Sequence, residues 1–342
     1  MKLKHSFLCV LLAAIMLFSA CGGKGKSEKS FFAMDTYVSV TVYGNGSAKN
    51  VKAAENLVKE LETKYGVNSV NGELRKLNSR GGAAEASDGI LEMLACARIL
   101  WERTNGSYDV TAKPLSELWG FVKDGNGVDK YRVPSETEIN EALLRVGMEK
   151  VAFGDDGNSV WLSNGAQIDL GSCAKGYIAQ KTAEMLKARN VSYAIISLGG
   201  NVQTVGEKPD GKLFSVGISD PKSPSGILGV IEVGETAVVT SGTYQRYFEQ
   251  EGKRYHHIFD AETGKPCENG LLSVTVVCEN GLWADALSTA LFLLGKDGAM
   301  EYYRTYGGFE AVIVSDDGSV TVTDGLKSVF TLTAEGYTIK QF

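Results

Sequence analysis

Two residues that could bind a metal ion stand one helical turn apart in the apolar segment 283–291. Asp285 and Thr289 are four positions apart, so in a helix their side chains emerge on the same face. Two hard oxygen ligands suit Mg²⁺, which takes few protein carboxylates and completes its shell with water and phosphate oxygens. The alternative is structural, with Asp285 at a helix start and Thr289 bonded to the backbone one turn earlier. Taken alone, the pair favours the structural alternative.

A second segment, residues 168–177, has the pattern of a phosphate-binding turn. It runs from a predicted strand at Ile168 through small residues into a predicted helix with Lys175 in its first turn. Backbone N–H groups at a helix start, together with a nearby cation, bind phosphate. Such turns are common, so this segment alone is weak evidence.

The histidines offer a general base. The chain has three, and two of them, His256 and His257, are adjacent and precede a turn that ends at Pro266. The side chain has an unperturbed pKa near neutrality, at about 6.5. Single histidines are usually structural, but a pair in a chain so poor in histidine favours chemistry.

Together with further motifs at 34–36, 106–111, 198–201 and 240–244, these segments resemble the ApbE family of FAD:protein FMN transferases from about Met34 to Leu294. Each motif is short, and the resemblance rests on their order and spacing. It implies an α+β fold related to the T-fold, in a single two-lobed domain.

The resemblance also implies the roles of individual residues. It places Mg²⁺ on the side chains of Asp285 and Thr289 and on a backbone carbonyl of the 169–175 turn, which we assign to Ser172. His257 would accept the proton of the attacking hydroxyl; His256 is the weaker candidate, because the family's single His directly precedes the Ile. The predicted FAD contacts are Met34, Asn68, Ser107, Tyr108, Asp109, Asp169, Lys175 and Ile258. Tyr108 can equally be a core aromatic whose backbone matters more than its ring.

The activity implied is Mg²⁺-dependent cleavage of the FAD pyrophosphate, with FMN attached through a phosphoester to a Thr or Ser of an exported or membrane redox subunit and AMP released. Displacement at a phosphate requires its negative charge to be neutralised. One departure favours hydrolysis of FAD to FMN and AMP instead. Relatives generally have an aromatic near Asn68 and a Ser at Gly72, and a stacked ring adds roughly 1 kcal/mol. A flavin-binding lipoprotein without catalysis is a third hypothesis.

The amino terminus has the pattern of a lipoprotein signal peptide at 1–20. A basic start is followed by an apolar run from Phe7 to Ala20, too short for a comfortable membrane span, and by Cys21. We expect cleavage before Cys21, a lipid on its thiol, a tether over 21–30 and the enzyme domain over 31–342. The protein would then be anchored to a bacterial cell membrane, facing the periplasm or the extracellular side. An ordinary secretory signal with an incidental cysteine is the alternative.

Composition agrees with an exported globular enzyme. The 342 residues are 44% hydrophobic and carry a net charge of -6, which gives no basic footprint for nucleic acid. No CxxC spacing occurs, so a zinc or redox site is not expected. Cys96 and Cys278 lie in apolar patterns and are predicted core thiols, and the pattern assigns no disulfide.

The elements that position these residues mix hairpins with helices. The periodicity predicts helices at 48–65, 90–104, 175–189 and from residue 283 to Gly295, and one from the Ser135 capping box to Gly147. Predicted strands lie at 37–43, 151–153, 160–162, 168, 193–197, 214–219, 228–233, 273–278, 309–315 and 320–323. Hairpins outnumber strand-helix-strand units, so the predicted class is α+β, with largely antiparallel sheets and packed helices.

Overall fold

The computed structural model describes residues 25–80, 82–123, 127–208, 210–223 and 225–341. The predicted signal peptide and Cys21 lie outside these ranges. None of the helices within them combines the length and the apolar composition that a membrane span requires. The four cysteines of the described ranges are free thiols, and Cys96, Cys173 and Cys267 are buried whereas Cys278 is half-buried.

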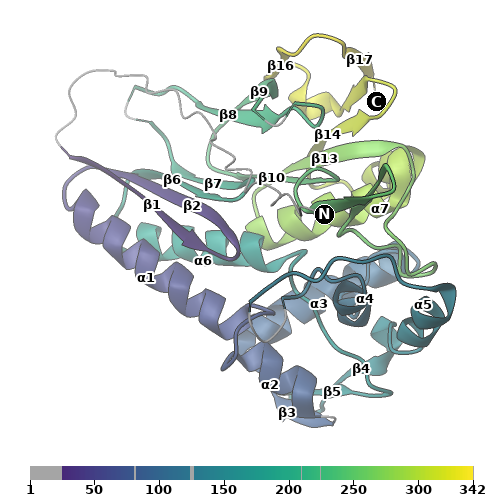
Figure 1. Cartoon of the computed structure of the whole chain (residues 1–342). Coiled ribbons are helices and arrows are strands. Elements are labelled where there is room, and N and C mark those ends of the chain that lie inside the picture. Colours follow the sequence, from purple (N-terminus) through teal and green to yellow (C-terminus); the bar gives the residue numbers. More distant parts are fainter. Residues whose placement is uncertain (1–24, 81, 124–126, 209, 224, 342) are drawn as a thin grey trace, which may run out of the picture.

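A nine-stranded sheet forms the centre of the molecule (Figure 1). Its order is β1 (Lys26–Ala33), β2 (Thr36–Tyr43), β6 (Tyr193–Leu198), β7 (Asn201–Gly206), β10 (Ala237–Gly242), β13 (Leu271–Cys278), β14 (Glu310–Ser315), β15 (Ser319–Val322) and β17 (Thr338–Gln341). Every neighbouring pair is antiparallel except β15 and β17. Together with the helices, this confirms the predicted α+β, largely antiparallel class.

Both faces of this sheet are buried. Successive strand residues point to opposite sides, so each strand contributes side chains to two different cores. Val239 and Ile313 face the helix layer, whereas their neighbours Val238 and Val314 face a second core. The helix layer consists of α1 (Ser47–Tyr65), α6 (Ala174–Ala188) and α7 (Gly281–Tyr306), and the opposite face is covered by a sheet of β16 (Phe330–Leu332), β9 (Ile227–Val233) and β8 (Phe214–Ser219) (Figure 1).

A second group of elements lies beyond the helix layer (Figure 1). It contains α2 (Glu73–Arg80), α3 (Asp88–Arg103), α4 (Lys113–Leu118), α5 (Glu136–Leu143), η1 (Met148–Lys150) and a sheet of β3 (Ala83–Glu85), β5 (Ser159–Leu162) and β4 (Val151–Phe153). The hairpin of β11 (Tyr247–Gln250) and β12 (Lys253–His256) packs Phe248 and Tyr255 onto the separate core around Trp119. The remaining element is η2 (Asp324–Leu326).

Most predicted elements are present within a few residues, and four differ, the fourth being the end of the helix that carries Asp285. The predicted tether overlaps β1, which begins at Lys26 and pairs with β2. The helix after the Ser135 capping box, which is formed as predicted, ends at Leu143 rather than Gly147. Segment 168 is not a strand, because the amide of Asn78 takes a neighbouring strand's place: Nδ2 donates to the Ile168 carbonyl (2.8 Å) and Oδ1 accepts from its N–H (2.6 Å).

The helix carrying Asp285 begins where Asn280 accepts a hydrogen bond from the Trp283 N–H (3.0 Å). Its predicted end at Gly295 is a kink, with φ 70° and ψ 177°, after which the helix resumes and continues to Tyr306. Glycine adopts this left-handed φ without a steric penalty.

Candidate active site

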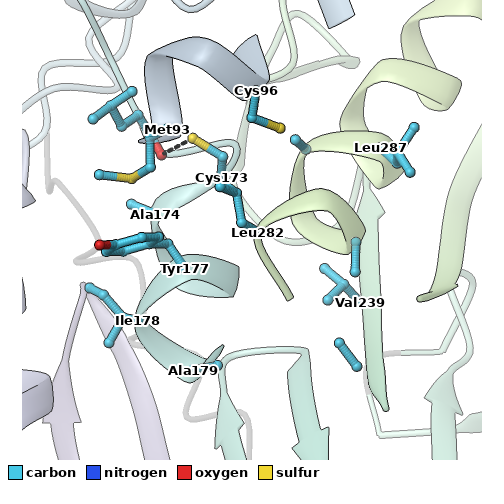
Figure 2. Packing of buried hydrophobic residues seen from close by; sticks show 14 of the residues in the cluster. Met93, Cys96, Cys173, Ala174, Tyr177, Ile178, Ala179, Val239, Leu282 and Leu287 are labelled. Carbon is cyan, nitrogen blue, oxygen red and sulfur yellow. Dashed lines mark hydrogen bonds between the residues drawn. The ribbon is translucent and has the colours of Figure 1, made fainter. Parts of the chain in front are cut away.

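The site is built on a close crossing of α6 and α7. A Cβ on Gly281 would lie 2.7 Å from the Gly176 carbonyl oxygen, and one on Gly176 would lie 2.5 Å from Asp285 Cβ. Figure 2 shows the apolar packing beside this crossing, where Cys173 of the turn before α6 and Leu282 of α7 belong to the same buried cluster. Two glycines therefore let the backbone of α6 approach the side chain of Asp285.

Asp285 is 2% exposed, and its carboxylate binds the start of the neighbouring helix. Its Oδ2 accepts a hydrogen bond from the Gly176 N–H (2.8 Å). Burial raises the pKa of the Asp285 carboxyl, against the smaller lowering effects of the Lys175 ammonium and the Gly176 amide. A buried carboxylate of this kind requires compensating positive charge.

The turn before α6 leaves a carbonyl oxygen available. In a helix that began one turn earlier, the Gly176 N–H would donate to Ser172, but here it donates to Asp285. No hydrogen bond between described residues ends on the Ser172 carbonyl. The Ser172 side chain is held by the buried Tyr108, with 2.8 Å between the two hydroxyl oxygens.

These atoms fit a divalent cation that shares its shell with a ligand. Asp285 has its second carboxylate oxygen available and Ser172 has its backbone carbonyl oxygen available. Thr289 lies one turn along α7 on the same face as Asp285. Within the described ranges, no three His, Cys, Asp or Glu side chains gather that could hold a metal by themselves. A cation here would therefore depend on phosphate or water oxygens, which is the behaviour of Mg²⁺.

Lys175 lies among the charged groups of the site. It is half-buried, and its Nζ donates to the Gly171 carbonyl (3.0 Å). Its ammonium contributes to lowering the pKa of both Asp285 and His257, so it lies near both. Asp169 shapes the same turn, because its Oδ1 accepts from the Gly171 N–H (2.8 Å).

The two adjacent histidines have different roles. His256 is 5% exposed and uses both ring nitrogens internally: Nε2 lies 3.0 Å from the Cys267 carbonyl, and Nδ1 accepts from the Ile258 N–H (3.3 Å). His257 Nδ1 lies 3.1 Å from the Arg246 carbonyl, which can only accept, so Nδ1 carries the proton. No hydrogen bond of the described residues involves its Nε2.

The environment of His257 keeps its imidazole neutral near pH 7. Burial and then the positive charge of Arg246 lower its pKa to about 3. With Nδ1 donating to a carbonyl, the neutral ring presents the Nε2 lone pair as a base. The tautomer and the open nitrogen support His257, rather than His256, as the candidate base.

The hairpin turn between β1 and β2 contains Met34, one of the predicted FAD contacts. Met34 and Asp35 have left-handed φ angles of 54° and 55°, which non-glycine residues rarely adopt. The turn is held by side chains from elsewhere: Glu62 Oε1 accepts from the Met34 N–H (2.6 Å), Asn68 Nδ2 donates to Asp35 Oδ2 (2.8 Å), and Lys123 pairs with Asp35. Three contacts stabilise a strained turn that simple propensity does not favour.

The segment from Gly199 to Asn201 lies between the Met34–Asp35 turn and the Asp285 carboxylate. A Cβ on Gly199 would clash with Thr36 Oγ1. Two residues later, the buried amide of Asn201 faces Asp285 and lowers the pKa of its carboxyl. This approach is longer than a regular hydrogen bond, since Asn201 Nδ2 has no partner at hydrogen-bond distance in the described ranges.

The candidate base His257 is connected to the same turn through the segment 121–123. Lys123, which pairs with Asp35, follows Phe121 by two residues, and the Phe121 ring lies 6.3 Å from the His257 ring. The hairpin turn, the base and the α7 face are thus linked into one neighbourhood.

The structure places the other predicted contacts as follows. The ring of Tyr108 is core, as the alternative interpretation states, and its hydroxyl is satisfied by Ser172. The Asp109 carboxylate accepts from the Thr111 N–H and hydroxyl and from the Met148 N–H (2.9 Å), so both of its oxygens are engaged within the protein. Ile258 is buried, Met34 is half-buried against the core, and the Ser107 N–H donates to the Thr104 carbonyl.

Sequence reasoning did not identify Asp35, Lys123, Asn201 and Ser241. The first and the last two lie in motifs noted above, but their partners come from distant segments. A cavity of about 560 Å³ near Trp283 and Leu287 and another of about 360 Å³ beside Lys64 contain none of the predicted site residues. The chemistry described above therefore lies outside both cavities.

Comparison with known proteins gives a consistent result. A model of the ApbE family matches residues 34–313. An FAD:protein FMN transferase of Klebsiella pneumoniae is 31% identical over 287 residues, covering 83% of this chain and 87% of its own length. One from Treponema pallidum is 29% identical, with 93% of both chains covered.

Solved structures show the same fold. The crystal structure of an ApbE protein from Thermotoga maritima superimposes with a TM-score of 0.82 at 32% identity, covering 89% of this chain and 99% of that chain. The apo form of the flavinyl transferase ApbE from Pseudomonas stutzeri gives a TM-score of 0.78 at 27% identity, covering 91% and 98%.

Proposed function

Because this chain belongs to the ApbE family, we propose that it transfers FMN from FAD to a Thr or Ser hydroxyl of an acceptor protein and releases AMP. The relatives named above carry this activity in their names. The observation that supports it most directly is the presence of a buried carboxylate, a lysine and a neutral imidazole with an open nitrogen in one neighbourhood.

Mg²⁺ would be held by Asp285, Thr289 and the Ser172 carbonyl. When bound, it would supply the positive charge that FAD phosphate oxygens need as the bond between the two phosphates breaks. Lys175 adds a fixed positive charge beside the same phosphates. Met34, Asn68, Asp169, Ile258 and the backbone of residues 107–109 are the proposed contacts to the rest of FAD.

His257 would accept the proton of the attacking hydroxyl at Nε2. The new bond joins the acceptor oxygen to the phosphorus of the FMN half, the bond to the AMP oxygen breaks, and AMP leaves. A pKa of about 3 describes the protein without FAD. The negative pyrophosphate brought by FAD stabilises the protonated ring and so raises this pKa, making His257 a stronger base when substrate is present.

Hydrolysis of FAD to FMN and AMP is the second candidate function. It is favoured by Asn68, because the Asn68 amide is bonded to Asp35 and provides no ring to stack on the cofactor, unlike the aromatic residue that the family resemblance implies near this position. Weaker retention of FAD would let water compete with the acceptor hydroxyl.

We also propose that Cys21 anchors the protein to the outer side of a bacterial cell membrane. The support is the signal pattern at residues 1–21. A Cys21→Ser variant should appear in the soluble fraction after cell breakage, whereas the unmodified protein should sediment with membranes; equal sedimentation would contradict the anchor.

The activity is tested by incubating purified protein with FAD, Mg²⁺ and an acceptor subunit, and identifying the products by mass. The proposal requires an FMN adduct on a Thr or Ser and one AMP per adduct, both lost when Mg²⁺ is chelated. Free FMN with no adduct would favour hydrolysis. Intact FAD after long incubation would favour a flavin-binding protein without catalysis.

A further inference from the structure

Three hydroxyl groups form a buried chain behind the face of α7 that carries Asp285. Ser241 Oγ of β10 lies 2.7 Å from Ser288 Oγ and 3.0 Å from Thr289 Oγ1. Ser288 Oγ donates to the Asp285 backbone carbonyl (2.8 Å). Ser241 and Ser288 are buried, with exposures of 8% and 0%.

The direction of every hydrogen bond in this chain is fixed. A hydroxyl has one proton and can accept twice, and a carbonyl oxygen can only accept. Ser288 therefore spends its proton on the Asp285 carbonyl. Ser241 must then donate to Ser288, and Thr289 must donate to Ser241. The Thr289 proton points into the core, away from the face of α7 shared with Asp285.

We propose that Ser241 is a positioning residue that turns the lone pairs of Thr289 Oγ1 toward the bound cation. This inference rests on the proposed function, since it concerns the cation that the reaction uses. A hydroxyl whose proton pointed at the cation would be repelled by it, so the direction of this one proton decides whether Thr289 can act as a ligand.

The position of Ser241 suits this task. It lies in β10, between β7 and β13, with Val274 as its partner in the β13 register. A central strand is held rigidly, and groups behind a metal ligand typically change metal affinity 10- to 100-fold when they are removed. Without Ser241, the Thr289 hydroxyl would donate to the Asp285 carbonyl one turn earlier, which reorients its lone pairs.

The test measures cation binding without FAD or acceptor, using Mn²⁺ as a paramagnetic probe followed by electron paramagnetic resonance. Ser241→Ala should weaken Mn²⁺ binding about 10-fold relative to the unmodified protein. Ser241→Thr keeps the donor and should restore it. The matched control is Thr240→Val on the same strand, whose lost hydroxyl pairs with Thr275 (2.8 Å) rather than with α7.

Asp285→Ala defines the binding that belongs to this site, and thermal unfolding shows whether each variant is folded. Mn²⁺ binding by folded Ser241→Ala that equals that of the unmodified protein, or an equal loss in Thr240→Val, would overturn the inference. Ser241-dependent Mn²⁺ binding in a protein that forms no FMN adduct would leave the inference standing and refute only the proposed function.

Discussion

The carboxylate of Asp285 accepts the backbone N–H of Gly176 at 2.8 Å, so a side chain of α7 caps the start of α6. The residue that precedes α6, Cys173, provides no side-chain cap of its own. A carboxylate at a helix start is favoured by the free N–H groups and by the helix dipole. One oxygen of Asp285 thus holds the two helices together, and the other is left for a ligand.

Substitutions at Asp285 should separate these two tasks. In Asp285→Asn, the amide oxygen still accepts from Gly176, so the free energy of unfolding should change by less than about 1 kcal/mol. FMN transfer should fall at least 100-fold, because the charge that holds the cation is gone. Urea unfolding and initial rates measure the two effects. A normal rate in a folded Asp285→Asn protein would remove this carboxylate from the mechanism.

Gly176→Ala should push α6 away from α7. The added methyl group would lie 2.5 Å from Asp285 Cβ, and overpacking of this kind costs about 1–3 kcal/mol. We expect lower stability together with weaker Mg²⁺ dependence of activity. Gly234→Ala is the control, because no atom lies within 4 Å of its added Cβ. Equal stability of both variants would contradict the close crossing.

The neighbouring histidines should respond in opposite ways. His257→Gln should lower FMN transfer by about 10²–10⁴-fold, the usual contribution of a general base, with little loss of thermal stability. His256→Gln should lower the melting temperature, because both of its ring nitrogens are bonded in the core. Its rate per folded molecule should remain within a few-fold. The reverse pattern would assign the base to His256.

Stability should depend on pH through His257. Its pKa is about 3 in the folded protein and about 6.5 when unfolded. The unfolded chain therefore binds the proton more tightly, so stability from this group is complete above pH 6.5 and is lost as the pH falls toward 3. Between pH 7 and pH 5, His257→Gln should lose about 2 kcal/mol less unfolding free energy than the unmodified protein. Parallel losses would show that the ring is accessible to protons when folded.

Asn68 should matter for FAD affinity more than for the chemical step. Asn68→Ala removes the hydrogen bond that restrains Asp35 in its left-handed turn, and a hydrogen bond to a charged group contributes about 1.5–3 kcal/mol. Part of this loss should appear as a roughly 3- to 10-fold higher KM for FAD, with kcat nearly unchanged. The exposed Asn71→Ala is the matched control. An unchanged KM would show that the turn does not depend on Asn68.

Local patterns were sufficient to predict the helix that carries Asp285 and Thr289 and the capping box at Ser135. The spacing of Asp285 and Thr289 requires only helical periodicity, and the capping box at Ser135 is read from four residues. The fold class was predictable from hairpin signals, because these are also short-range patterns in the sequence. The family resemblance then ordered the motifs and is confirmed by the matching family model.

What could not be predicted depends on residues far apart in the chain. Asn78 replaces a strand partner for Ile168 across 90 positions, and no local pattern indicates this. Lys123 reaches Asp35 across 88 positions. Ser241 looked like part of a short motif, and only the packing of β10 against α7 shows its link to Thr289.

The kink at Gly295 leaves carbonyl groups at the end of the first part of α7 that need donors. Asn269 Nδ2 donates to the Phe292 carbonyl (2.6 Å). Two residues earlier, the Cys267 carbonyl receives the ring of His256, next to the proposed base. The short stretch 267–269 therefore forms hydrogen bonds with both the cation-binding helix and the histidine segment. Residues 267–269 thus help to fix the spacing between the proton acceptor and the charge that offsets the phosphates, and a shift there would displace both.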